Sequence, residues 1–294
     1  MKQKVNTFTE EINNAIAVII PQSPLSTNLE ESMSYSLEAG GKRIRPVLLL
    51  LTLDMLTSNH EQGLSPALAL EMIHTYSLIH DDLPPMDNDD YRRGKLTNHK
   101  VYGEWKAILA GDALLTKAFD VVSHDETLSD SVKLKLIQRL SQASGHLGMV
   151  GGQTLDMQSE NQEIQIDLAT LEQIHRTKTG ALITFAVMAA SDIAQVENHV
   201  ADALYEYSDH IGLMFQIKDD LLDIYGDEEK LGKSVGSDLE NHKSTYVSLL
   251  GLDGAEEKLQ HHTDAAYDCL AQIEQQYDTS NLKYIIELFV NRDH

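Results

Sequence analysis

Residues 68–82, LALEMIHTYSLIHDD, decide the fold because their apolar positions repeat with the period of an α-helix. Positions near i, i+3, i+7 and i+8 are taken by Leu70, Ile73, Ser77 and Leu78, which share one helical face. Two prolines follow the acidic end of this stretch, and they should end or kink the helix after Asp82. The pattern therefore predicts a helix with carboxylates at its carboxyl end.

The rest of the chain continues this helical pattern. Leu182–Ala190 is an apolar block, and Val200–Tyr225 is a long run with few helix breakers. There is no convincing hairpin signal, no alternation of strands and helices, and no segment biased enough to be an interdomain linker. We therefore predict an all-α fold of about ten helices, in a single domain over residues 1–294.

Composition excludes several classes of function. Lys and Arg number 23 against 46 Asp and Glu, and this net charge of −23 disfavours binding to DNA or RNA. Cys269 is the one cysteine, which excludes an intramolecular disulfide and a thiolate zinc site and fits a reducing compartment. The longest aliphatic run, Val47–Leu51, is far below the roughly 18 apolar residues of a membrane span. We expect a cytoplasmic protein with no stable membrane insertion.

Two aspartate clusters are the strongest chemical signal. The first runs from Asp81 through Asp82 to Asp87, and the second is Asp219-Asp220-Leu221-Leu222-Asp223. Such hard oxygen ligands suit Mg²⁺, which proteins usually hold with one or two carboxylates and the phosphates of a substrate. The alternative is a solvated acidic face, although two such motifs are harder to explain in that way. The clusters predict a phosphorylated substrate.

Spacing strengthens this interpretation. Residues at i, i+3, i+4 and i+7 share one helical face, and this is the spacing of Gln216, Asp219, Asp220 and Asp223. His74 and Asp81 are seven residues apart and also share a face. Asp87 would lie about 240° further round an uninterrupted helix, but Pro84 and Pro85 allow the chain to bulge and bring Asp87 back towards Asp81.

Local basic clusters supply the complementary charge in an otherwise acidic chain. They lie at Gly40–Pro46, Arg92–Lys95, His175–Gly180 and Lys233–Lys243. Each could serve only as a solubilising or helix-capping feature, but together with the aspartates they could clamp a diphosphate and stabilise it as a leaving group. No Gly-x-Ser-x-Gly elbow or phosphate-binding Gly-rich loop is present, so the sequence offers no support for a side-chain nucleophile.

In order and spacing, seven blocks of the sequence resemble the trans-isoprenyl diphosphate synthases, the polyprenyl synthetase family, and most closely its bacterial members that make farnesyl diphosphate. These blocks are Gly40–Pro46, Glu71–Gly94, Ile108–Leu115, Gly148–Asp156, Arg176–Gly180, Gly212–Asp223 and Leu231–Gly251. The resemblance implies an isoprenoid synthase fold, a large helical bundle around a central active-site cavity. It also implies a homodimer.

The resemblance implies a prenyl transfer reaction. Mg²⁺ would assist ionisation of dimethylallyl or geranyl diphosphate, the double bond of isopentenyl diphosphate would attack the allylic cation, and a proton would be lost. This head-to-tail 1′-4 condensation gives (2E,6E)-farnesyl diphosphate and diphosphate. Three Mg²⁺ ions per active site are implied, with Mn²⁺ able to substitute, and an apolar cavity would protect the cation from water.

Site residues follow from the same resemblance. The metal ligands would be Asp81, Asp87 and Asp219, assisted by Asp82, Asp220 and Asp223. Isopentenyl diphosphate would be bound by Gly41, Lys42, Arg45, His74 and Arg93. The allylic diphosphate would be bound by Arg92, Lys178, Lys233 and Lys243, with Thr179 and Gln216 near the reacting carbons. The sequence departs from the family pattern at Lys106, Lys117 and Ser237, and these departures leave the reaction class intact.

Product length is the finer question. Tyr76 and Ser77 lie at the positions that would control it, and the Pro84-Pro85 insertion also matches the pattern of bacterial C15 producers. Tyr76 lies five residues before Asp81, a rise of about 7.5 Å along a helix, so its ring could block a growing chain. If Tyr76 is ordinary core packing, the alternative is a geranylgeranyl diphosphate synthase. A class I terpene cyclase and an inactive prenyl synthase subunit are further alternatives.

Overall fold

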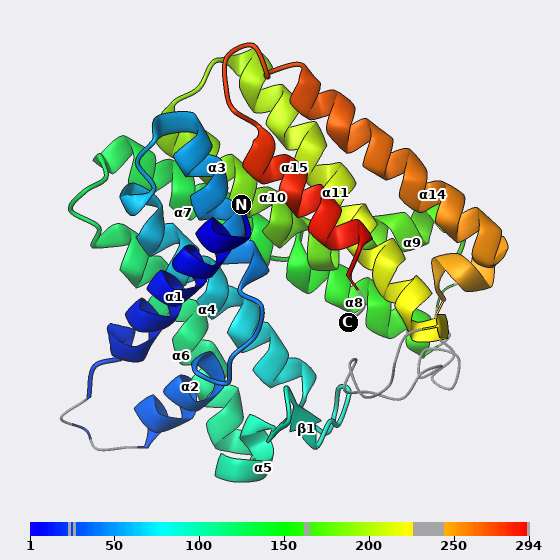
Figure 1. Cartoon of the computed structure of the whole chain (residues 1–294). Coiled ribbons are helices and arrows are strands. Elements are labelled where there is room, and N and C mark those ends of the chain that lie inside the picture. The colour runs from blue at the N-terminus through cyan, green and yellow to red at the C-terminus, as the bar shows by residue number, and fades with distance from the viewer. Residues whose placement is uncertain (23–24, 26–27, 162–163, 165, 226–243, 293–294) are drawn as a thin grey trace.

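The computed structural model describes residues 1–22, 25, 28–161, 164, 166–225 and 244–292. Within them the chain is a bundle of α-helices (Figure 1), which confirms the predicted all-α class. In chain order the helices are α1 (Lys2–Ile19), α2 (Leu29–Leu37), α3 (Ile44–Thr57), η1 (Glu61–Gly63), α4 (Leu64–Asp81), α5 (Asn98–Tyr102), α6 (Glu104–Ser123), α7 (Asp130–Ser144), α8 (Met149–Glu160), α9 (Leu168–His175), η2 (Arg176–Gly180), α10 (Ala181–Ala194), α11 (Asn198–Tyr225), α14 (Tyr246–Ala271) and α15 (Ser280–Val290).

The core of the bundle is built around α3. Its run Val47–Leu51 is at most 1% exposed, because α1, α4, α10 and α15 all pack against this helix. A strongly apolar helix is expected where several other helices pack around it. α4 packs chiefly on α6, and α11 packs chiefly on α14. Among the described residues, no helix is both long enough and apolar enough to cross a bilayer.

A short hairpin corrects one expectation from the sequence. β1 (Tyr91–Arg92) and β2 (Lys95–Leu96) pair antiparallel, with Tyr91 opposite Leu96, so the expected absence of hairpins was wrong at this position. The two turn residues, Arg93 and Gly94, have φ of +54° and +75°, as the tightest hairpin turns require. Strands of two residues are too short to produce a visible alternation of apolar and polar side chains.

The chain leaves α4 as the prolines predict. α4 ends at Asp81, and the backbone N–H of Asp87 donates to the Asp81 carbonyl at 2.8 Å. The N–H of Asn88 donates to the carbonyl of Leu83 at 3.2 Å, which closes a tight loop around Pro84 and Pro85. The predicted bulge is therefore confirmed at the backbone, and it returns Asp87 to the end of α4.

Candidate active site

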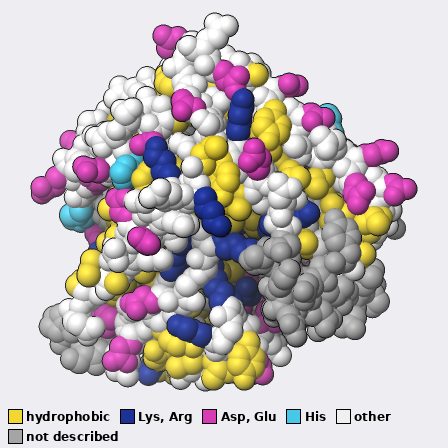
Figure 2. Space-filling view, viewed as in Figure 1, with side chains coloured by type: hydrophobic (Ala, Val, Ile, Leu, Met, Phe, Trp, Pro, Cys, Tyr) yellow, Lys and Arg dark blue, Asp and Glu magenta, His cyan; other side chains and the backbone are white. Residues whose placement is uncertain are grey.

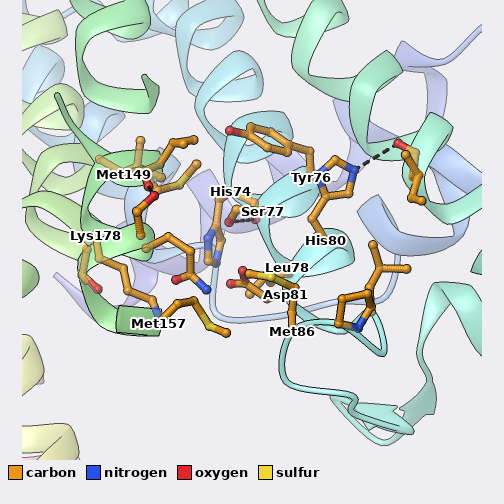
Figure 3. Close-up of a pocket in the computed structure, with 18 of the residues that line it drawn as sticks. His74, Tyr76, Ser77, Leu78, His80, Asp81, Met86, Met149, Met157 and Lys178 are labelled. Atoms are coloured by element: carbon orange, nitrogen blue, oxygen red, sulfur yellow. Dashed lines mark hydrogen bonds between the residues drawn. The ribbon is translucent and has the colours of Figure 1, made fainter. Parts of the chain in front are cut away.

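A cavity of about 680 Å³ lies beside the carboxyl-terminal half of α4. Figure 3 shows His74 and Asp81 of α4 and Lys178 of η2 facing the same space. Much of the remaining wall is apolar, formed by Leu78, Leu83, Met86, Ile108, Met149, Val150, Met157 and Leu182. A few polar groups at one part of an apolar cavity are typical of a site that orients a largely hydrocarbon ligand.

Asp81 is placed where its negative charge is unfavourable without a cation. Burial, reinforced by the nearby carboxylates of Asp87 and Asp82, raises its pKa from 3.8 to about 6, although Lys178 and Arg92 oppose this rise. Among the residues that the structure describes, no three acidic, histidine or cysteine side chains converge on one point as a preformed metal cage. Mg²⁺ rarely needs such a cage, because it commonly binds one or two carboxylates together with substrate phosphates. The Asp81 and Asp87 pair fits that mode.

Asp82 has a different role from its neighbour. Its side chain is buried, and Arg92 of β1 donates to its Oδ1 from Nε at 2.7 Å. Arg92 also lies 3.4 Å from the exposed carboxylate of Asp89. Asp82 therefore holds Arg92 in place at the end of the hairpin, close enough to Asp81 for the two charges to interact.

The residues expected to bind isopentenyl diphosphate form a concentrated basic region. Arg45 Nη1 lies 3.3 Å from His74 Nε2, and both side chains line the cavity. Burial lowers the pKa of His74 well below its ordinary value, and the nearby Arg45 and Arg93 lower it further. His74 is therefore neutral, and its Nε2 accepts from the guanidinium.

Gly41 makes room for one of these cations. It has φ of +123°, and a Cβ at this position would come within 2.6 Å of the Arg93 guanidinium carbon. Arg93 in turn donates to the carbonyl of Gly40. The structure thus brings Gly41, Arg45, His74 and Arg93 together, with Lys42 exposed next to them in the chain. Figure 2 shows Lys and Arg side chains gathered around the hollow in the middle of one face, while acidic side chains are spread around it.

Lys178 and Thr179 belong to a turn of π-helix, η2, between α9 and α10. π-Turns are rare and occur often at functional sites. Gly152 of α8 allows this turn to approach closely, since a Cβ there would overlap the backbone of Lys178. Lys178 Nζ donates to Asp156 Oδ2 at 2.5 Å. The turn and the ion pair fix Lys178 in the cavity wall, and Thr179 is buried beside it.

The second aspartate motif lies on α11, and its members have different partners. Asp220 accepts the backbone N–H of Tyr246 at 2.7 Å and so anchors the start of α14. Asp223 is buried, whereas the Asp219 side chain is 45% exposed. Asp219 acts electrostatically on Arg45 by raising its pKa, although burial lowers that pKa overall. The second motif is therefore within electrostatic reach of the basic region. Gln216 lies one turn before Asp219 on α11 but is not part of the cavity lining described above.

Two contacts in this region were not anticipated from the sequence. Arg292, beyond α15, donates from Nη2 to Asp219 Oδ1 and to the carbonyl of Phe215, both at 2.6 Å, and lies 4.0 Å from the centre of the Phe215 ring. The second contact is the ion pair between Asp156 and Lys178. In the sequence, Asp156 lies within a matched block but has no assigned role, and Arg292 lies outside every block. Lys233, Lys243 and Ser237 fall outside the described residues.

Residues 26–286 match the protein family described as Polyprenyl synthetase, and the chain belongs to this family, as its motifs predicted. It is 50% identical over 296 residues to a farnesyl diphosphate synthase of Geobacillus stearothermophilus, covering 100% of this chain and 98% of the relative. It is also 50% identical over 295 residues to a farnesyl diphosphate synthase of Micrococcus luteus, covering 100% of both.

The fold is shared with solved structures. A Zymomonas mobilis protein described as an FPP/GFPP synthase superposes with a TM-score of 0.85 at 36% identity, covering 98% of this chain and 96% of that chain. The isoprenoid synthase fold expected from the sequence is therefore confirmed.

Proposed function

We propose that this protein is an Mg²⁺-dependent farnesyl diphosphate synthase. It condenses isopentenyl diphosphate with dimethylallyl diphosphate and then with geranyl diphosphate. The observation that carries the proposal is one apolar cavity whose wall includes Asp81 together with the cations Arg45 and Lys178. The full-length relatives named above support the same activity and its C15 product.

The two diphosphates bind different sets of residues. Arg45, His74 and Arg93, which lie together, bind isopentenyl diphosphate with Lys42 and Gly41. Arg92, oriented by Asp82, and Lys178, oriented by Asp156, bind the allylic diphosphate with Lys233 and Lys243. Forked guanidiniums and point-charge ammoniums both match phosphate oxygens. Thr179, in the cavity wall, and Gln216, on α11, would stabilise positive charge on the reacting carbons through their dipoles.

Asp81, Asp87 and Asp219 would hold Mg²⁺, which would supply positive charge to stabilise the departing diphosphate. The chain's own residues hold both substrates with the allylic carbon facing the double bond of isopentenyl diphosphate, while the apolar wall excludes water. The allylic C–O bond breaks, a new C–C bond forms, and a proton is lost from the product cation. Three Mg²⁺ ions per active site, replaceable by Mn²⁺, would neutralise this diphosphate together with the basic residues.

Tyr76 limits the product to C15. Its side chain is 6% exposed and lines the cavity, as Ser77 does one residue later. Burial and then the charge of Asp81 raise the pKa of Tyr76 to about 12, so the ring stays neutral at physiological pH. A bulky neutral ring in the wall is suited to stopping a growing hydrocarbon chain. A C20 product is the second candidate, and it would form if the Tyr76 ring moved aside for a longer prenyl chain.

We also propose a homodimer, supported by apolar residues on the surface of α6. The exposed fractions of Trp105, Ile108 and Leu109 are 64%, 43% and 47%. Exposed apolar patches often mark protein interfaces. Sedimentation equilibrium would test this assembly, and a monomer at all concentrations would contradict it. The expected cytoplasmic location stays a prediction.

The activity is tested by incubating purified protein with Mg²⁺, isopentenyl diphosphate and dimethylallyl diphosphate, followed by dephosphorylation and identification of the prenyl alcohols. Farnesol as the main alcohol would support the proposal. Geranylgeraniol would retain the reaction but overturn the C15 product, and the absence of any condensation would overturn the reaction itself.

A further inference from the structure

Tyr76 is supported by a second ring one helical turn away. The rings of Tyr76 and His80 meet edge to face, with centroids 5.7 Å apart and planes at 76°. Residues at i and i+4 lie side by side on a helix, so α4 itself brings them together. Both side chains line the cavity (Figure 3), which places His80 directly beside the residue that limits the product.

His80 also connects α4 to the neighbouring helix α6. Its Nε2 lies 3.0 Å from the carbonyl oxygen of Ile108, the contact drawn as a dashed line in Figure 3. A carbonyl can only accept, so Nε2 carries the proton and donates it. The carboxylate of Asp112 is 4.0 Å from the same nitrogen, beyond hydrogen-bond distance, so the Ile108 carbonyl is the partner.

Gly111 of α6 makes this contact sterically feasible. A Cβ at Gly111 would overlap Nε2 of His80 and come within 2.6 Å of its Cδ2. A glycine inside a helix costs about 1 kcal/mol relative to alanine. Because Gly111 has no side chain, the imidazole of His80 can occupy the space beside it. The close approach of His80 to α6 therefore depends on residues of both helices, His80 in α4 and Gly111 in α6.

We propose that His80 is a positioning residue for product length. It fixes the Tyr76 ring relative to α6, whose Ile108 also lines the cavity, and thereby sets how long a chain fits. This inference rests on the proposed function, because it concerns the length of the prenyl product. Without the link to Ile108, the Tyr76 ring can rotate or move away and the cavity lengthens.

The test compares the prenyl alcohols made by His80→Leu, His80→Gln and the unchanged protein. Leucine fills a similar volume without a donor, and we expect the ratio of geranylgeraniol to farnesol to rise about tenfold, the discrimination that one methylene supplies in an apolar pocket. The glutamine amide can still donate to the Ile108 carbonyl and should restore most of the original ratio. Asp112→Asn is the matched control, since it alters the other neighbour of Nε2 and should leave the ratio unchanged.

Gly111→Ala provides an independent test, because its Cβ displaces His80 without altering the ring. It should shift the product in the same direction as His80→Leu, and it decides the matter if the leucine variant does not fold. The inference is overturned if the unchanged protein makes farnesol and the folded His80→Leu or Gly111→Ala variant makes the same mixture. An equal shift in Asp112→Asn would also overturn it. If the unchanged protein forms no condensation product, the proposed function fails instead.

Discussion

Arg43 and Glu71 form an ion pair that is buried on both sides. Arg43 Nη1 lies 2.6 Å from Glu71 Oε1, and the side chains are 2% and 3% exposed. The same guanidinium donates to the carbonyl of Leu37 at 2.6 Å and to the side chain of Asn13 at 3.0 Å. Arg43 thus ties the start of α3 to three other segments, and its neighbours Lys42 and Arg45 are positioned by that attachment.

Breaking this pair should strongly destabilise the fold. Glu71→Gln leaves a buried guanidinium without a counter-charge, and we expect the free energy of unfolding to fall by about 3 kcal/mol. Urea denaturation followed by circular dichroism measures this change. The double variant with Arg43→Met and Glu71→Leu should recover much of the loss, because it removes both charges. A Glu71→Gln variant as stable as the original would show that the charge of Glu71 is not needed.

Asp81 makes the stability of the metal-free protein depend on pH. Its folded pKa of about 6 lies above 3.8, so the folded state holds the proton more tightly and loses stability as pH rises between these values. The full difference corresponds to about 3 kcal/mol, and partial solvent access should reduce it to about 1 to 2 kcal/mol. In EDTA, Asp81→Asn should therefore be more stable than the original at about pH 7.5 and similar to it near pH 3.5. Equal stability at both pH values would contradict the unfavourable charge assigned to Asp81.

Asp156 should act on catalysis through Lys178. Asp156→Asn removes the charge that orients the ammonium, and we expect kcat to fall about tenfold, with a smaller effect in Asp156→Glu. A double-mutant cycle separates positioning from general damage. If Asp156 acts through Lys178, the asparagine change should have little further effect in a Lys178→Ala background. Fully additive losses in kcat would argue against this coupling.

Arg45 should affect one substrate more than the other. Arg45→Ala removes a cation from the basic region, so we expect the KM for isopentenyl diphosphate to rise about tenfold or more while that for dimethylallyl diphosphate changes little. Initial rates with each substrate varied in turn give both constants. Arg139, paired with Asp192, is outside the cavity, and Arg139→Ala serves as the control arginine. A rise only in the KM for dimethylallyl diphosphate would mean that the two sites are assigned in reverse.

Tyr76 should determine where chain growth stops. Tyr76→Ala opens the cavity wall, so geranylgeraniol should replace farnesol as the main alcohol after dephosphorylation. Tyr76→Phe keeps the ring and loses only the hydroxyl, and it should still give farnesol. A folded, active alanine variant that makes only the C15 product would leave Tyr76 as core packing.

The helices and the loop after α4 were predictable because their causes are local. Periodic apolar positions predict the helices, and Pro84 with Pro85 predicts the bulge that returns Asp87 to Asp81. The hairpin was not predictable in the same way, because its two-residue strands carry no period. The π-turn at Lys178 was also not predictable from the local sequence, since Gly152, which packs against it, comes from another helix.

The local sequence pattern also could not predict the individual roles of adjacent acidic residues. Asp81 and Asp82 look equivalent in sequence, but one lines the cavity and the other is buried against Arg92. Asp219 and Asp220 differ similarly, because only Asp220 meets the backbone of Tyr246. These partners come from other segments of the chain, so only the packed fold separates the residues that face the cavity from those that hold its walls.

Within the π-turn Arg176–Gly180, the number of amino-acid residues is critical. A π-turn contains an extra residue compared with an α-turn, so deleting one residue there would allow α9 and α10 to form a continuous helix. The wider turn takes up the extra residue, so α9 and α10 would keep nearly the same orientation after its deletion, and the change would fall on the turn itself. Lys178 and Thr179, which line the cavity from this turn, would then point in different directions. Single-residue deletions should thus be far less tolerated within this turn than substitutions that preserve its length.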